Sequence, residues 1–194
     1  MWLYFIRHGQ TLNNLEGRMN PWDDDDILTG VWIEQAKQVW ERIRNQGISF
    51  DVIISSTLQR AHETAKIIAK ILSYTWEIIT DPRLREQDAW VFVWKKRDDI
   101  KRELALQSDD EFRRVFKSKD HNGVEDIIEF DTRVREVYLE TIEEFSWKNI
   151  LFVAHSWTSR ALLRAVQDWD FEYFYFQMPW VGNCELIDLE SYGR

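Results

Sequence analysis

The stretch "LFVAHSWTSRALL", residues 151–163, sets the fold class of this chain. The apolar run from Ile150 to Ala154 predicts a buried strand, and residues 158–166 predict the helix that follows it. A short turn that begins with His155 separates the two elements. A strand that passes through a short turn into a helix is the repeating unit of an α/β fold.

The same alternation of strand and helix continues in both directions. Further strands are predicted at residues 3–6, 51–55, 77–80 and 185–189. One helix is expected after a Thr29 cap and ends at Gly47, a second follows a Ser56 or Thr57 cap, and a third covers residues 127–145. We therefore expect a three-layer α/β sandwich, with a mostly parallel central sheet, helices on both faces and a single domain over residues 1–194.

Composition narrows the class of protein. A net charge of −9 argues against nucleic-acid binding, because such proteins usually show a basic face. The one cysteine, Cys184, fits a reducing compartment and is expected to be a small buried hydrophobe. The N-terminal "MWLYFI" is too short for a signal sequence, and no segment has the length of a membrane span. These features predict a cytoplasmic protein without membrane contact, and they leave a homodimer open.

Residues 95–121 differ from the rest, because their Lys and Arg residues outnumber Asp and Glu in an acidic chain. They predict a helical excursion with two short helices. One interpretation is a solvated surface segment with many intrahelical ion pairs. The other is a lid near the active site, over a pocket that attracts an anion.

Four chemically active groups follow predicted strands. Arg7 and His8 end the first strand, Arg60 lies in the first turn of the helix after the second, and His155 ends the fourth. Glu86 follows the third strand. Ligands of open α/β sheets bind at the carboxyl ends of the strands, so these side chains are expected to meet there. Arginine binds phosphate oxygens in bidentate fashion, and a neutral histidine can attack phosphorus.

These motifs resemble those of the histidine phosphatase superfamily, which includes the cofactor-dependent phosphoglycerate mutases. "RHGQT" matches the family's Arg-His-Gly-x-Thr signature, and "DDILTGVWIEQA" and "SSTLQRAHETA" match two further stretches. The resemblance implies that His8 is the nucleophile and Glu86 the proton donor. It also implies that Arg7, Asn14, Arg60 and His155 bind phosphate, and that no metal or cofactor is needed.

The resemblance implies an activity as well. The short excursion favours a phosphomonoester phosphatase, acting on a small phosphorylated metabolite through a phosphohistidine, over a phosphoglycerate mutase. A binding protein with impaired catalysis is the third possibility. "NGVED" at residues 122–126 matches the family's Gly-Glu-Ser segment only loosely, and Ile27 replaces a family proline. The substrate therefore stays open.

Several other polar residues are expected to have structural or solvent-exposed roles rather than catalytic ones. Asp88, Glu103 and Glu125 are alternative acids, but the preceding Leu-Arg pair favours Glu86. Ser55 and Ser56 are interpreted as turn and cap residues rather than nucleophiles. The remaining predictions concern His62 and His121, expected to be solvated, and the acidic run at residues 23–26, which lacks the spacing of a cation site.

The tryptophan and glycine counts of this chain are both unusual, and they have two interpretations: a genuinely tryptophan-rich protein, or tryptophan at positions where glycine is expected. There are 11 tryptophans and 7 glycines, fewer glycines than a usual share of about 7% would give. On the family pattern, Trp32, Trp90, Trp94 and Trp157 occupy glycine positions, and Trp40 and Trp147 occupy places where glycine would be natural. We expect strained or crowded backbone at these sites rather than core packing. Our hypothesis is that many of these residues are encoded by UGA codons that the source organism uses for glycine.

Overall fold

The computed structural model describes residues 1–20, 26–117, 123–168, 170–172, 175, 178 and 180–192. Its strands are β1 (Leu3–Arg7), β2 (Val52–Ser56), β3 (Ile79–Asp81), β4 (Ile150–Ala154) and β5 (Leu186–Asp188). They form one sheet in the order β3-β2-β4-β1-β5, parallel except for β5, which is antiparallel to β1. The predicted α/β class with a mostly parallel sheet is confirmed.

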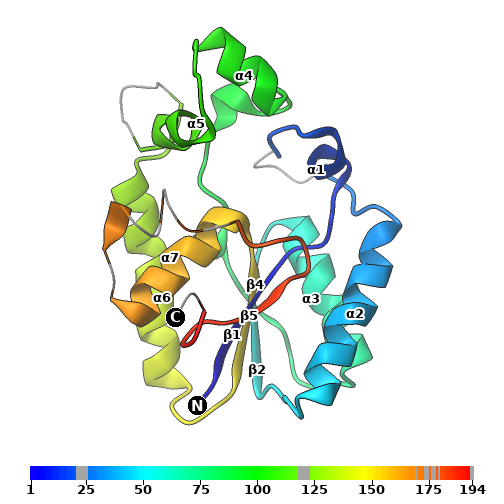
Figure 1. Cartoon of the computed structure of the whole chain (residues 1–194). Helices are drawn as coiled ribbons and strands as arrows, with labels where there is room; N and C mark the ends of the chain where they lie inside the picture. Colours follow the sequence, from blue (N-terminus) through cyan, green and yellow to red (C-terminus); the bar gives the residue numbers. More distant parts are fainter. Residues whose placement is uncertain are drawn as a thin grey trace.

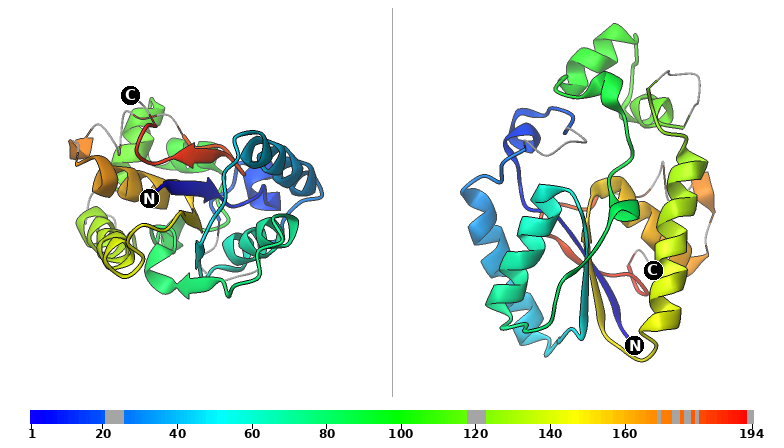
Figure 2. Two further views of the ribbon diagram at one scale, coloured as in Figure 1. Left: turned by 90° about the horizontal axis from the view of Figure 1, so that it is seen from below. Right: turned by 180° about the vertical axis from the view of Figure 1, so that it is seen from behind.

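Helices cover both faces of the sheet (Figures 1 and 2). They are α1 (Leu12–Glu16), α2 (Val31–Asn45), α3 (Gln59–Ile71), α4 (Arg97–Glu103), α5 (Asp109–Val115), α6 (Ile127–Glu144) and α7 (Ser156–Gln167). Two 3-10 turns, η1 (Pro82–Leu84) and η2 (Trp90–Phe92), follow β3. In Figure 1, α6 and α7 lie on one side of the sheet, and α2 and α3 on the other.

Alternating side chains of the strands build two separate cores. Phe5 and Phe152 belong to the cluster on the α6 and α7 side, whereas Ile6 and Val153 belong to the cluster on the α2 and α3 side. All five residues of β2 and all five of β4 are buried. The near-continuous apolar runs that predicted these strands are therefore the consequence of a sheet covered on both faces.

The excursion lies beyond the carboxyl ends of the strands. Helices α4 and α5, which are the two short helices predicted there, stand above the sheet on the same end as α1 (Figure 1). A β-bridge between Arg18 and Lys96 joins the α1 segment to the start of α4. Residues 118–121 of the predicted excursion lie outside the described residues.

Four predicted boundaries are wrong. Helix α7 begins at Ser156 with His155 as its N-cap, so no separate turn precedes residue 158. Gly30 rather than Thr29 is the N-cap of α2, and Leu58 rather than Ser56 or Thr57 is the N-cap of α3. Strand β3 begins at Ile79, two residues later than predicted. It is the edge strand of the sheet, and its pairing with β2 starts only at Ile79, opposite Ile54.

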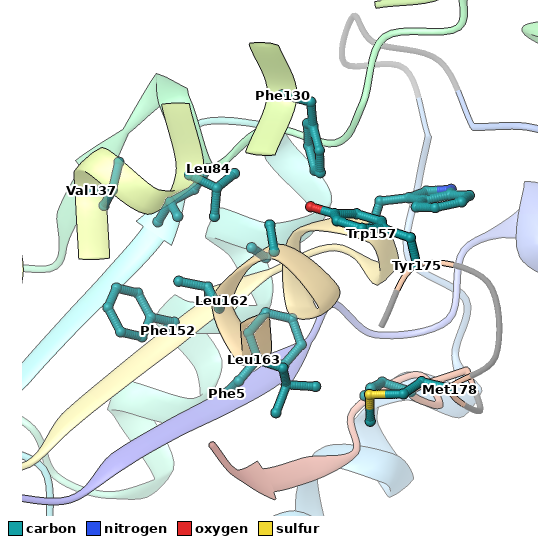
Figure 3. Packing of buried hydrophobic residues seen from close by; sticks show 14 of the residues in the cluster. Phe5, Leu84, Phe130, Val137, Phe152, Trp157, Leu162, Leu163, Tyr175 and Met178 are labelled. Carbon is teal, nitrogen blue, oxygen red and sulfur yellow. The ribbon is translucent and has the colours of Figure 1, made fainter. Parts of the chain in front are cut away.

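The tryptophans divide into two groups. Trp94 and Trp147 have φ values of 68° and 71°, in the left-handed region where glycine is favoured, and the Trp147 side chain is 88% exposed. Positive φ is not found at the other four positions named above, all of which are described. The expectation that packing plays no part is wrong for Trp32 and Trp157, which are both buried. Trp157 lies in the core beside Tyr175 (Figure 3).

Candidate active site

The carboxyl ends of β1, β2 and β4 and the loop after β3 surround a cavity of about 390 Å³. Five of the six predicted site residues line it, namely Arg7, His8, Asn14, Arg60 and Glu86. The sixth, His155, is fully buried behind the cavity wall, and its ring centroid lies 5.2 Å from that of His8. All six residues thus meet at one end of the sheet.

His8 has a defined tautomer. Its Nδ1–H donates to the carbonyl of Gly9 at 2.9 Å, which leaves Nε2 as the unprotonated nitrogen. Burial, helped by the charges of Arg60 and Arg7, holds the pKa of His8 well below its usual value. Gly9 must be glycine, because a Cβ there would lie 2.9 Å from the Cβ of Trp32. The geometry therefore presents His8 as a neutral imidazole with a free lone pair.

His155 is held by the end of β2. Its Nε2 lies 2.8 Å from the hydroxyl oxygen of Ser56, and that oxygen also accepts from the backbone N–H of Leu58 at 3.2 Å. Nδ1 of His155 is buried and makes no hydrogen bond to any residue in the described part of the chain. Burial, with Arg60 and His8 nearby, lowers the pKa of His155 well below its usual value. Ser56 thus positions a histidine and is not placed as a nucleophile.

Two arginines give the cavity its positive charge. Arg60, in the first turn of α3, is only 2% exposed. Arg7 is half-buried, donates from Nη1 to the carbonyl of Val181 at 2.9 Å, and its pKa is lowered by burial. A phosphate between these guanidinium groups would supply the counter-charge that their burial demands.

An asparagine that the sequence analysis missed completes this wall. Asn183 donates from Nδ2 to the carbonyl of His8 at 2.9 Å and to Oδ1 of Asn14 at 3.0 Å. Asn14 in turn donates to Asn20 at 3.1 Å. The position of Asn183 just before a predicted strand was visible in the sequence, but that strand, β5, is antiparallel, so it is its amino end that reaches the cavity.

Glu86 faces the cavity from the loop after β3. Its carboxylate accepts the backbone N–H of Trp157 at 3.0 and 3.2 Å, and that of Gln87 at 3.2 Å. Burial raises the pKa of Glu86, whereas the Trp157 N–H and the charge of Arg7 lower it. A carboxyl under these opposed influences is suited to give and accept a proton.

The alternative acids are engaged elsewhere. Glu125 is paired with Arg133 at 2.7 Å, and Glu103 with Lys95 at 2.7 Å. Asp88 accepts the backbone N–H of Trp90 at 3.0 Å. None of these three carboxylates lines the cavity, so Glu86 is the one that the structure places there.

The outer part of the cavity is aromatic and basic. Arg18 and Arg97 line it together with Phe112, Phe116, Trp157 and Trp180. The Arg97 guanidinium lies 4.9 Å from the Phe112 ring centroid and 5.5 Å from that of Trp180, and no hydrogen bond or ion pair joins it to a described residue. Arg18, by contrast, is paired with Glu16 at 2.6 Å.

Other predicted residues lie away from the cavity. His62 is half-buried rather than solvated, with Nδ1 3.3 Å from the hydroxyl of Ser55. Cys184 is buried, as expected, and burial raises its pKa to about 12. His121 and residues 23–25 of the acidic run lie outside the described residues, while Asp26 accepts the N–H of Asn13 at 3.4 Å. No described cluster of three His, Cys, Asp or Glu side chains has the arrangement of a metal site.

Known phosphoglycerate mutases and phosphatases are similar to this chain in sequence or in structure. A segment of 84 residues, 43% of this chain, is 49% identical to a probable phosphoglycerate mutase, GpmB, of Yersinia pestis (strain Pestoides F), and covers 37% of that relative's length. Among solved structures, a mycobacterial glucosyl-3-phosphoglycerate phosphatase complexed with VO3 has a TM-score of 0.81 at 23% identity, over 95% of this chain and 90% of that one. The α-ribazole phosphatase of Shigella flexneri has a TM-score of 0.76 at 23% identity, over 96% and 88%.

Within the described ranges, every helix is too short or too polar to cross a bilayer. The model of one family, the histidine phosphatase superfamily (branch 1), matches residues 3–194. The solved structures share its fold, and the motifs around His8, Arg60 and His155 meet in one cavity, as described above. The chain belongs to the histidine phosphatase superfamily.

Proposed function

We propose that the protein is a metal-independent phosphatase that hydrolyses a small phosphomonoester through a phosphohistidine. The observation that carries the proposal is the neutral His8, with its Nε2 free, beside two arginines and the protonatable Glu86. In phosphoryl transfer most of the catalysis is positioning and charge stabilisation, and the guanidinium groups supply the positive charge.

The reaction has two steps. Nε2 of His8 attacks phosphorus, the bond between phosphorus and the ester oxygen breaks, and Glu86 donates its proton to the departing oxygen. A water molecule then attacks the phosphohistidine, Glu86 takes a proton from that water, and the P–N bond breaks to release inorganic phosphate. Arg7, Arg60, Asn14 and His155 bind the phosphoryl oxygens, and the unsatisfied Nδ1 of His155 is the atom we assign to that contact.

The outer cavity supports a substrate class. With the phosphate on Arg7 and Arg60, the Arg97 guanidinium still faces the cavity and forms no ion pair with a described residue, although its charge helps to lower the pKa of Asp109. A phosphomonoester that carries a second anionic group would supply an ion-pair partner. The charge of residues 95–121 is consistent with the lid that the sequence suggested.

The test uses the purified protein with a panel of phosphorylated metabolites. Turnover is expected to survive exhaustive chelation, and vanadate is expected to inhibit by imitating five-coordinate phosphorus. Rapid acid quenching with a ³²P-labelled substrate is expected to trap no label, and alkaline quenching to trap label that His8→Ala lacks, because phosphohistidine is acid-labile. Activity that chelation abolishes and a divalent cation restores would refute the mechanism.

A second candidate is phosphoryl transfer of the mutase type, which the name of the Yersinia relative favours. The short helices α4 and α5 of the excursion favour the phosphatase, because a mutase must shield its phosphoenzyme from water. The two differ in product. A phosphatase releases inorganic phosphate in proportion to substrate lost, whereas a mutase forms an isomeric phosphate ester without that release. A binding protein with impaired catalysis would form no phosphoenzyme.

A further inference from the structure

Arg133, on α6, is spread across the loop that carries Glu86. Its Nη1 donates to the carbonyl of Arg85 at 2.9 Å and also to that of Arg83, and its Nη2 donates to the carbonyl of Glu86 itself at 3.1 Å. A guanidinium presents its donors in a fixed planar fork, so one side chain fixes three backbone carbonyls of residues 83–86 relative to α6. Arg133 does not line the cavity.

Glu125 orients that fork. Its two carboxylate oxygens accept from Nε and Nη2 of Arg133 at 2.7 and 2.8 Å, in a bidentate pair whose side chains are about one-fifth exposed. Glu125 also accepts the backbone N–H of Asp88 at 3.0 Å, and its own N–H donates to the carbonyl of Asp88 at 2.7 Å. The pair is therefore hydrogen-bonded to the backbone on both sides of Glu86, at Arg85 and at Asp88.

The neighbouring Gln87 joins the same loop to the excursion. Its side-chain amide donates to the carbonyl of Phe116, at the end of α5, and to the carbonyl of Glu125, each at 2.8 Å. The backbone around Glu86 is thus fixed between α6, the end of α5 and residue 125. Since the Glu86 carboxylate must stay on the N–H of Trp157 to face the cavity, a small displacement of this backbone would move the acid.

We propose that Arg133 and Glu125 are a positioning pair that holds the proton-donating Glu86 at the phosphate pocket. The proposal rests on the proposed function, since it assigns to the pair an effect on proton donation to the leaving group. Neither residue contacts the substrate. Their removal should weaken acid catalysis while the binding of phosphate by Arg7, His8 and Arg60 is kept.

The test compares two substrates in the full-length protein. 4-Nitrophenyl phosphate has a leaving group that departs without protonation, whereas a simple alkyl phosphate needs the acid. The value of kcat/KM reports the steps from free enzyme and substrate through phosphoenzyme formation, and not the later hydrolysis. In Arg133→Met, and in Glu125→Gln, kcat/KM for the alkyl ester is expected to fall at least about tenfold more than for the aryl ester. Arg133→Lys, which keeps the charge with fewer donors, should recover part of that ratio.

Arg83 supplies the matched control. It also joins this segment to α6, through a bidentate pair with Glu140 at 2.9 and 2.6 Å, but its side chain contacts no atom of Glu86 among the hydrogen bonds described. Arg83→Met should leave the ratio of the two kcat/KM values unchanged. An unchanged ratio in Arg133→Met, or an equal change in Arg83→Met, would show a merely structural role and overturn the proposal.

A second measurement separates this proposal from the proposed function. A wild-type protein that hydrolyses neither ester would refute the phosphatase. The pair would then be judged by the titration of the Glu86 carboxyl, followed by ¹³C NMR. We expect its pKa to change in Arg133→Met, because the carboxylate leaves the Trp157 N–H. Identical titration curves in wild type and Arg133→Met would overturn the positioning role.

Discussion

The backbone N–H of Trp157 donates to both carboxylate oxygens of Glu86, at 3.0 and 3.2 Å. Trp157 is the second residue of α7, so Glu86 occupies the free amino end of the helix that follows His155. A helix N-terminus favours the ionised carboxylate, whereas burial favours the protonated acid. One contact thus joins helix α7, whose N-cap is His155, to the acid of the loop after β3.

The first prediction concerns Glu86→Gln. Loss of the proton donor should lower kcat/KM for an alkyl phosphate by about 10²–10⁴-fold, the usual contribution of general acid catalysis. Phosphorylation by 4-nitrophenyl phosphate should survive, because its leaving group needs little protonation, and the phosphoenzyme should then accumulate. Steady-state kinetics with both esters and quench-flow trapping check this. Equal loss on both esters would contradict the role of Glu86.

The second prediction concerns stability at mildly acidic pH. His8 and His155 have folded-state pKa values below the unfolded value of about 6.5, so the unfolded state binds more protons beneath that pH. Their contribution is complete above pH 6.5 and is lost as pH falls, at up to about 1.4 kcal/mol per pH unit for each histidine. Glu86, whose pKa is raised, acts with the opposite sign.

Urea unfolding between pH 5 and 7.5 measures this effect. The free energy of unfolding of the wild type should fall more steeply below pH 6.5 than that of His8→Gln/His155→Gln, and Glu86 cancels in the comparison because both proteins contain it. His62→Gln is the control for a histidine outside the cavity; burial lowers the pKa of His62 too, so this variant should flatten the curve, but less than the double variant does. Parallel curves for wild type and the double variant would show that the two histidines are not buried in the neutral form.

The third prediction concerns the substrate class. Arg97→Met keeps the length of the side chain but removes the cation over Phe112 and Trp180. For esters with a second anionic group, KM should rise about tenfold, the size of one charge-assisted contact. For 4-nitrophenyl phosphate, KM should change less than about twofold, since the energy of contacts elsewhere is unaltered. Lys66→Met, on the exposed face of α3, controls for net charge.

The fourth prediction concerns the tryptophans at positive φ. A left-handed conformation costs a non-glycine residue about 1–3 kcal/mol, which exceeds the entropy that glycine loses on folding, about 0.5–1 kcal/mol. Trp147→Gly should therefore raise the free energy of unfolding by about 1 kcal/mol. Trp94→Gly should also raise the free energy of unfolding, but by less, because the buried half of the Trp94 side chain would lose its packing. Trp76→Gly is the control, because Trp76 is 73% exposed and its φ is not positive.

The codons provide an independent readout of the same hypothesis. We expect UGA at positions 32, 90, 94 and 157, and also at 147, and mass spectrometry of the protein from its source organism should then find glycine there. UGG codons at positions 32, 90, 94 and 157 would refute the hypothesis. At Trp157 the expected effect on stability is the opposite. Its indole packs against Phe116, Tyr175 and Trp180, so Trp157→Gly would open a cavity and lower the free energy of unfolding of this chain.

Local sequence predicted the strands that are buried on both faces. The apolar runs that became β1, β2 and β4 were predicted to within a residue or two, since burial on both faces leaves an unbroken apolar signal. The capping residues were predicted less well. Ser56 was expected to cap a helix, but its hydroxyl holds His155, which is 99 residues away in the chain. No local pattern reports such a contact.

The residues of the candidate site could be predicted from the sequence. Arg7, His8, Arg60, Glu86 and His155 each follow a predicted strand, and parallel strands bring their carboxyl ends to one edge of a sheet. The contacts of these groups could be found only from the folded chain. The contact of Arg133 with the carbonyl of Glu86 depends on packing between distant segments, and the contact of Asn183 with His8 depends on an antiparallel strand. These contacts join residues that are far apart in the chain, so no local pattern predicts them. The apolar patterns of strands and helices, by contrast, involve residues that are close in sequence.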